Sequence, residues 1–156
     1  MVSLPDPVVA ENRWLAAMER SAVAALRRPP PSDDRFSARV VEDRIRKVFR
    51  LGATDRLPSV CEESLRDYHA YLAKTLSFPF RASRCEETEP LVLDDSVIAT
   101  ALCDPARTPL DSAAGILCEV VFRRIARLPL ALLKVEPSNA NCQIIDDYWH
   151  WFWNCR

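Results

Sequence analysis

Carboxylates form the most distinctive chemical pattern in this sequence, and they fall in two clusters. Segment 86–95 holds five carboxylates in ten residues, and two adjacent aspartates follow further along the chain. The members of the clusters are Glu86, Glu87, Glu89, Asp94, Asp95, Asp146 and Asp147. Calcium takes roughly six to eight oxygen ligands, so neither cluster suffices alone. We therefore predict a calcium site if the clusters converge, with the turn at 137–141 supplying further amide and carbonyl oxygens.

An acidic surface without a bound ion is the alternative interpretation. Segment 86–95 would then be a solvated loop, and the two aspartates would lie in the first turns of a helix, where they favour the positive end of its dipole. The Asp-x-Asp-x-Asp-Gly pattern of an EF-hand is absent.

Signatures of catalysis are also missing from the chain. It contains no G-x-S-x-G, H-E-x-x-H or P-loop pattern. Adjacent residues on a helix point about 100° apart, so Asp146 and Asp147 are poorly placed as an acid–base pair. The six cysteines are widely spaced, with no C-x-x-C pair, which argues against structural zinc. We expect a protein that is not an enzyme, with no catalytic residue and no organic cofactor.

Composition indicates a globular chain with one well-buried core. Of its 156 residues, 49% are apolar and 28% are charged, and no apolar run is long enough for a transmembrane helix. Residues 1–58 carry 11 Arg/Lys and 8 Asp/Glu, whereas residues 59–156 carry 10 and 14. Nucleic-acid binding needs clustered positive charge, which the acidic second part lacks. Because the first residues also lack a secretory signal, we expect a cytoplasmic protein that binds neither nucleic acid nor membrane.

Hydrophobic periodicity predicts three helices in the first half of the chain. They cover about 7–28, 36–51 and 59–76, and the proline-rich segment 29–34 separates the first two. We expect Gly52 to end the second helix, and Ser59 with Glu62 to form a capping box for the third.

From Phe78 onward the pattern changes to short strands, and a closing helix follows residue 141. The strand signals lie at 78–85, 97–103, 115–123 and 125–135, where Pro129 favours an edge or a bend. The aromatic group after residue 147 could stack a ligand, but its helical spacing favours the core, so we expect Tyr148 and Phe152 to be buried. The fold class is therefore α+β: N-terminal helices, then a small antiparallel β-barrel or curled sheet, then a C-terminal helix.

Three segments resemble the small cyanobacterial-type calcium-binding protein family typified by the heterocyst calcium-binding protein. They are YHAYLAKTLSFPF, GILCEVVF and LPLALLKVEPSNANCQIIDDYWHWF, within about residues 64–154. The resemblance implies an SH3-like barrel that binds calcium through surface acids and buffers or modulates the ion. Residues 1–58 have no counterpart in it.

Two parts and two functions are therefore predicted. Residues 1–58 would be a helical extension with a linker at 29–34, and residues 59–156 a compact α+β calcium-binding domain. The first function is a non-catalytic, calcium-binding or calcium-responsive protein with calcium as its ligand. The second is a metal-free protein-interaction module with an SH3-like surface and a protein partner.

Overall fold

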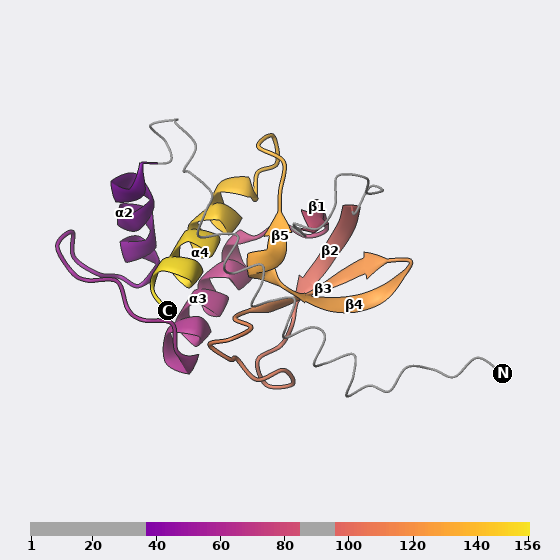
Figure 1. The fold of residues 1–156 in the computed structure, drawn as a ribbon, viewed down its shortest axis with the longest axis horizontal. Helices are drawn as coiled ribbons and strands as arrows, with labels where there is room; N and C mark the ends of the chain where they lie inside the picture. Colours follow the sequence, from indigo (N-terminus) through magenta and orange to yellow (C-terminus); the bar gives the residue numbers. More distant parts are fainter. Residues whose placement is uncertain (1–36, 85–95) are drawn as a thin grey trace.

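The computed structural model describes residues 37–84 and 96–156, which form an α+β fold with three helices beside one antiparallel sheet (Figure 1). The helices are α2 (Ala38–Val48), α3 (Glu62–Thr75) and α4 (Cys142–Asn154). The α+β class is thus confirmed. The helix expected at 7–28 and the linker at 29–34 lie outside the described residues.

Helices α2 and α3 bury the apolar stripes expected from the sequence, but their ends differ from prediction. Helix α2 ends through Arg50, which adopts φ +56°, and not through Gly52. The capping box of α3 joins Cys61 to Ser64, because the Ser64 hydroxyl accepts from the Cys61 amide at 2.9 Å. The Ser59 carbonyl instead accepts a hydrogen bond from that same hydroxyl at 2.8 Å, so the predicted capping role of Ser59 is wrong.

The sheet contains five strands in the order β4-β3-β2-β1-β5. Their bounds are Phe80–Arg84 for β1, Ser96–Leu102 for β2, Leu117–Phe122 for β3, Arg124–Pro129 for β4 and Leu133–Lys134 for β5. Every neighbouring pair is antiparallel. Segment 125–135 is not one strand, because the 3-10 turn η2 (Leu130–Leu132) follows Pro129 and carries the chain from one edge of the sheet to the other.

The predicted barrel is not confirmed, because the sheet is open. Within the described residues no ladder joins β4 to β5, which lie at opposite edges. Strand β5 is only two residues long, so its edge offers little backbone for pairing with β4. None of the helices in the described ranges combines the length and the apolar character needed to cross a bilayer.

Alternation along the strands gives the sheet one covered face and one open face. Val97, Ala99, Cys118 and Val120 point into a core shared with α3 and α4. Val41 and Ile45 of α2 belong to the same core, so the described part of the predicted extension packs against the rest of the chain.

Aromatic side chains fill the space between the helices and the sheet. Tyr148, Trp151 and Phe152 are buried as expected, and Tyr68 of α3 stacks on Trp151 with ring centroids 4.9 Å apart. The Tyr148 hydroxyl accepts a hydrogen bond from the Ile116 amide at 2.9 Å. Gly115 has φ +68°, and a Cβ there would lie 2.5 Å from the Tyr148 oxygen, so only glycine allows this close approach.

Candidate functional site

The first acidic cluster lies outside the described residues, but its two anchoring strands are well defined. Segment 86–95 connects the end of β1 to the start of β2, and Ser83 pairs with Ser96 across that ladder. Backbone spacing between paired strands is about 5 Å. The end of β1 and the start of β2, which border the acidic segment in the sequence, therefore lie side by side.

A small hollow lies at this point. It has a volume of about 260 Å³ and is lined by Arg81, Ala82, Ser83, Ser96, Lys134 and Glu136. Glu136 thus adds one carboxylate beside Ser96, the residue that directly follows the acidic segment. Arg81 and Lys134 bring positive charge to the same place.

Asp147 holds two helices together. Its two carboxylate oxygens accept hydrogen bonds from Nε and Nη2 of Arg44, each at 2.7 Å, and this bidentate pair joins α4 to α2. The side chains are 11% and 23% exposed for Asp147 and Arg44, so the pair is largely shielded from water. The hydrogen bond to Asp147 raises the pKa of Arg44 above its usual value. The role of Asp147 as a metal ligand stays a prediction, but both oxygens are already engaged.

Asp146 lies one residue earlier on α4 and points in another direction. The Cys142 thiol, one helical turn away, lies 3.5 Å from its carboxylate oxygen. Burial, followed by the nearby negative charge of Asp146, raises the pKa of that thiol to about 11. The structure therefore gives the two adjacent aspartates different surroundings, as expected from their separation around the helix.

No group of three or more His, Cys, Asp or Glu side chains converges as a metal site within residues 37–84 and 96–156. The described residues alone therefore do not fit a calcium ion, which needs more oxygen donors than Asp146 and Glu136 supply. Convergence of the two acidic clusters stays a prediction, because segment 86–95 lies outside these ranges.

The residues that carry the family resemblance support the fold. Asn141 is buried, and its side-chain amide accepts from the Ser77 amide at 3.0 Å and donates to the Ser77 carbonyl at 2.8 Å. It thereby fixes the turn before Phe78-Pro79-Phe80. Trp151 donates to the Pro58 carbonyl at 3.0 Å, which secures the segment that enters α3. These contacts explain the motif without any ligand.

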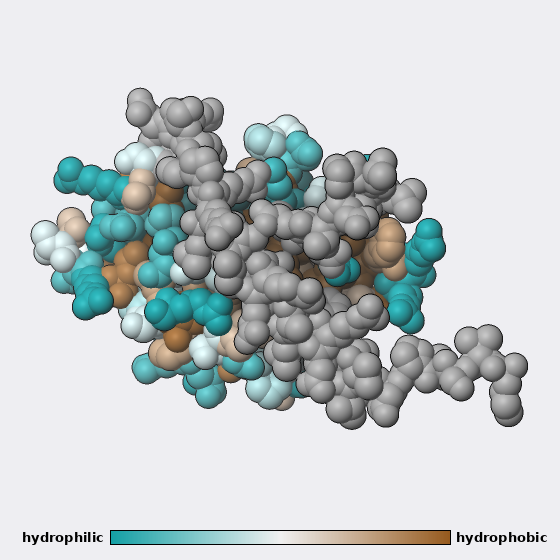
Figure 2. Space-filling view, viewed as in Figure 1, coloured by the Kyte–Doolittle hydropathy of each residue, from teal (hydrophilic) through white to brown (hydrophobic). Residues whose placement is uncertain are grey.

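A second surface lies on the open face of the sheet. The register places Ile98, Val121 and Ile125 in one row across β2, β3 and β4, and their exposed fractions are 44%, 39% and 68%. Arg81 continues the row onto β1. At the right of Figure 2, over the β3–β4 hairpin, hydrophobic residues lie beside strongly hydrophilic ones. Sequence analysis missed this row, because it could not assign the outward positions without the register.

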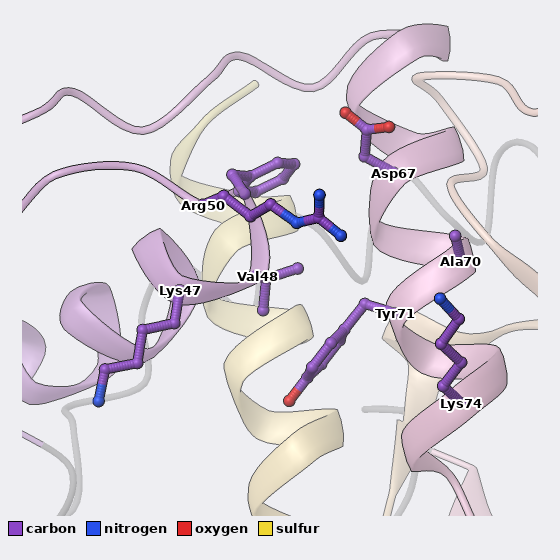
Figure 3. A pocket seen from close by; sticks show the side chains of 8 residues that line it. Lys47, Val48, Arg50, Asp67, Ala70, Tyr71 and Lys74 are labelled. Carbon is purple, nitrogen blue, oxygen red and sulfur yellow. The ribbon is translucent and has the colours of Figure 1, made fainter.

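A third feature, also missed, is an open cleft between the end of α2 and α3 (Figure 3). Its volume is about 460 Å³, and three of its lining residues are basic: Lys47, Arg50 and Lys74. The sequence offered no signal for it, since these residues come from two separate helices.

Comparisons with known proteins give one likeness in structure. No protein-family model matches the chain, and no curated protein sequence matches it. The crystal structure of Anabaena CcbP is similar with a TM-score of 0.48 and 18% sequence identity, over 77% of this chain and 93% of that chain. At this level the likeness carries no argument about function.

Proposed function

We propose that the protein is a non-catalytic calcium-binding protein whose ion is held by the acidic connection between β1 and β2. The pairing of Ser83 with Ser96 carries this proposal. In the sequence these strands are joined by segment 86–95, which contains five carboxylates and no Lys or Arg. Carboxylates held close together repel one another, and a divalent cation relieves that repulsion.

The chemistry of the donor set fits calcium better than softer metals. Calcium prefers carboxylate and carbonyl oxygens, which this connection and Glu136 provide. In this proposal Asp147 keeps α2 in place through Arg44, and Asp146 is the member of the second cluster to be tested as a ligand. The resemblance of residues 64–154 to a calcium-binding family supports the same function.

Calorimetric titration with calcium, followed by thermal unfolding, tests the proposal. Calcium should raise the melting temperature because it binds the folded form preferentially, and magnesium should raise it less because it gives up its water reluctantly. The E86Q/E87Q variant should lose most of the calcium-induced shift.

The matched control is E62Q/E63Q, which removes two adjacent glutamates from the exposed first turn of α3. It should keep the full calcium shift. A wild-type melting curve that calcium leaves unmoved, or an equal loss of the shift in both variants, would remove the basis for this function. A D146N variant then decides whether the second cluster contributes.

The open face of the sheet favours a second function, binding of a protein segment. Ile98, Val121 and Ile125 form an exposed apolar row, and Arg81, which continues the row, has no ion-pair partner among the described residues. Apolar side chains next to such an arginine suit a partner that carries both acidic and apolar side chains.

A fluorescently labelled peptide of alternating leucine and glutamate would probe this surface. Its anisotropy should rise on binding, and I125S should weaken the affinity by about tenfold. The control is V40S, since Val40 is a comparably exposed apolar residue on α2, away from the sheet. Equal affinity in both variants would count against the surface.

A further inference from the structure

We propose that the cleft between the end of α2 and α3 binds a small organic phosphate monoester. The cleft lies between Lys47–Arg50 and the side of α3 that carries Asp67, Ala70, Tyr71 and Lys74. Its volume of about 460 Å³ falls within the range typical of small-molecule sites. It shares no lining residue with the open face of the sheet.

Positive charge dominates the lining. The lining contains three basic residues, Lys47, Arg50 and Lys74, and one carboxylate, that of Asp67. None of the three cations forms an ion pair in the part of the chain that the structure describes. By contrast, Arg44 and Arg46, on the same helix as Lys47, each have carboxylate partners. The lining therefore carries a net positive charge, which favours an anion such as a phosphate monoester.

The backbone of Arg50 points to the same function. Its amide donates to the Lys47 carbonyl at 3.2 Å, and the Leu51 amide donates to the Arg46 carbonyl at 2.9 Å. These two bonds form a Schellman motif, in which the residue with positive φ is usually glycine. A side chain there is strained, and such strain is found preferentially at functional sites. Here the strained residue places a guanidinium in the cleft.

Figure 3 shows the arrangement of the donors. The Arg50 guanidinium reaches from the end of α2 towards α3, where the Lys74 ammonium lies beside Ala70, whereas Lys47 extends away. The small Ala70 side chain leaves room between the two cations. Guanidinium groups bind phosphate oxygens in a bidentate manner, and an ammonium adds a third donor.

The remaining walls are apolar and suit the organic part of a monoester. Val48, Phe49 and the ring of Tyr71 line the cleft beside the basic residues. Phe49 also packs edge-on against Tyr68, with centroids 5.6 Å apart, which ties this wall to the aromatic core. A ligand with a flat ring can therefore contact an apolar wall while its phosphate meets Arg50 and Lys74.

Calorimetry with phenyl phosphate tests the site directly, without added calcium. Phenyl phosphate should bind more tightly than inorganic phosphate, and phenol should show no measurable binding. The K74Q variant should bind phenyl phosphate with about tenfold lower affinity, as expected for the loss of one charge-assisted hydrogen bond. The control R66Q removes an exposed cation from α3 outside the cleft and should leave the affinity unchanged.

The R50G variant separates this proposal from a merely structural role. Glycine relieves the strain at positive φ, so the melting temperature should rise, by about 3 °C. The same variant should lose at least about tenfold in affinity for phenyl phosphate. A more stable R50G protein that binds phenyl phosphate as well as wild type would overturn the site, as would equal losses in K74Q and R66Q. Calcium binding depends on other residues, so either proposal can fail alone.

Discussion

On the covered face of the sheet nearly every side chain has a partner, whereas the open face exposes large apolar side chains to water. Val120 and Val121 are adjacent on β3, yet Val120 is 1% exposed and Val121 is 39% exposed. On the covered side, α4 makes the hydrogen bond between Tyr148 and the Ile116 amide, and it pairs with α2 through Asp147 and Arg44. The difference teaches that the two faces contribute unequally to stability: side chains on the covered face are buried in the core, whereas those on the open face remain largely in water.

The largest test of this division is Phe152→Ala on the covered side. Phe152 is 1% exposed and stacks on Tyr148 with centroids 5.8 Å apart. Truncating it should lower the free energy of unfolding by about 3–5 kcal/mol, because it leaves a cavity in the core. Urea unfolding measures this change. Trp149→Ala, a half-buried aromatic on the same helix, is the control and should cost less than half as much. A loss below about 1 kcal/mol for Phe152→Ala would contradict its core role.

The next largest effect is expected at the ion pair between α2 and α4. Asp147→Asn leaves Arg44 partly buried without its carboxylate. The cost should be about 2 kcal/mol, between the values for exposed and for fully buried pairs. The double variant R44M/D147L removes both charges and should recover part of that loss. Urea unfolding of the wild type and both variants checks the prediction. If D147N were as stable as the wild type, the ion pair would not contribute to stability.

A smaller effect is expected from pH, through Cys118 on the covered face. Burial raises the pKa of its thiol from 9.0 to about 12. Above pH 9 the unfolded chain loses this proton while the folded protein keeps it, so stability falls as pH rises. At pH 10 the loss should be about 1–2 kcal/mol.

Unfolding in urea under reducing conditions at pH 8 and pH 10 measures that loss. Cys118→Ala removes the thiol, so its stability relative to wild type should improve by about 1–2 kcal/mol between the two pH values. A constant difference between the two proteins would show that the Cys118 thiol does not contribute.

The smallest effect is expected on the open face. Val121→Ala should change the free energy of unfolding by less than about 0.5 kcal/mol, because the side chain remains largely in water. Val120 lies one residue earlier and points inward. Val120→Ala should lower the free energy of unfolding by about 2 kcal/mol, because it removes two buried methyl-sized groups and leaves a cavity. Comparable losses for these neighbours would mean that the open face is covered in solution.

Local patterns in the sequence were sufficient for most of the fold. The stripe of α3, formed by Leu65, Tyr68, Leu72 and Leu76, is buried as its spacing predicted. Strands β1 to β5 all fall between residues 79 and 135, and the closing helix follows Asn141. Such signals can be read locally because side-chain periodicity reflects the geometry of a single element.

The errors arose where distant segments meet. The Val60 amide donates to the Cys155 carbonyl at 2.8 Å, and this contact with the end of the chain accompanies the start of α3 at Cys61 and Ser64 instead of Ser59. The open sheet likewise depends on where β5 pairs, which no local pattern states. The partner of Asp147 could not be predicted either, because Arg44 lies 103 residues away, while its predicted role as a metal ligand stays a prediction.

The sequence by itself determined the elements, the buried stripes and the presence of a carboxylate-rich connection. Only the tertiary structure decided which charges are paired, which strand positions face water, and that Lys74 and Arg50 share a cleft. The physical reason is that periodicity and turn chemistry act over a few residues, whereas the energy of a charge or an apolar side chain depends on what the fold brings beside it.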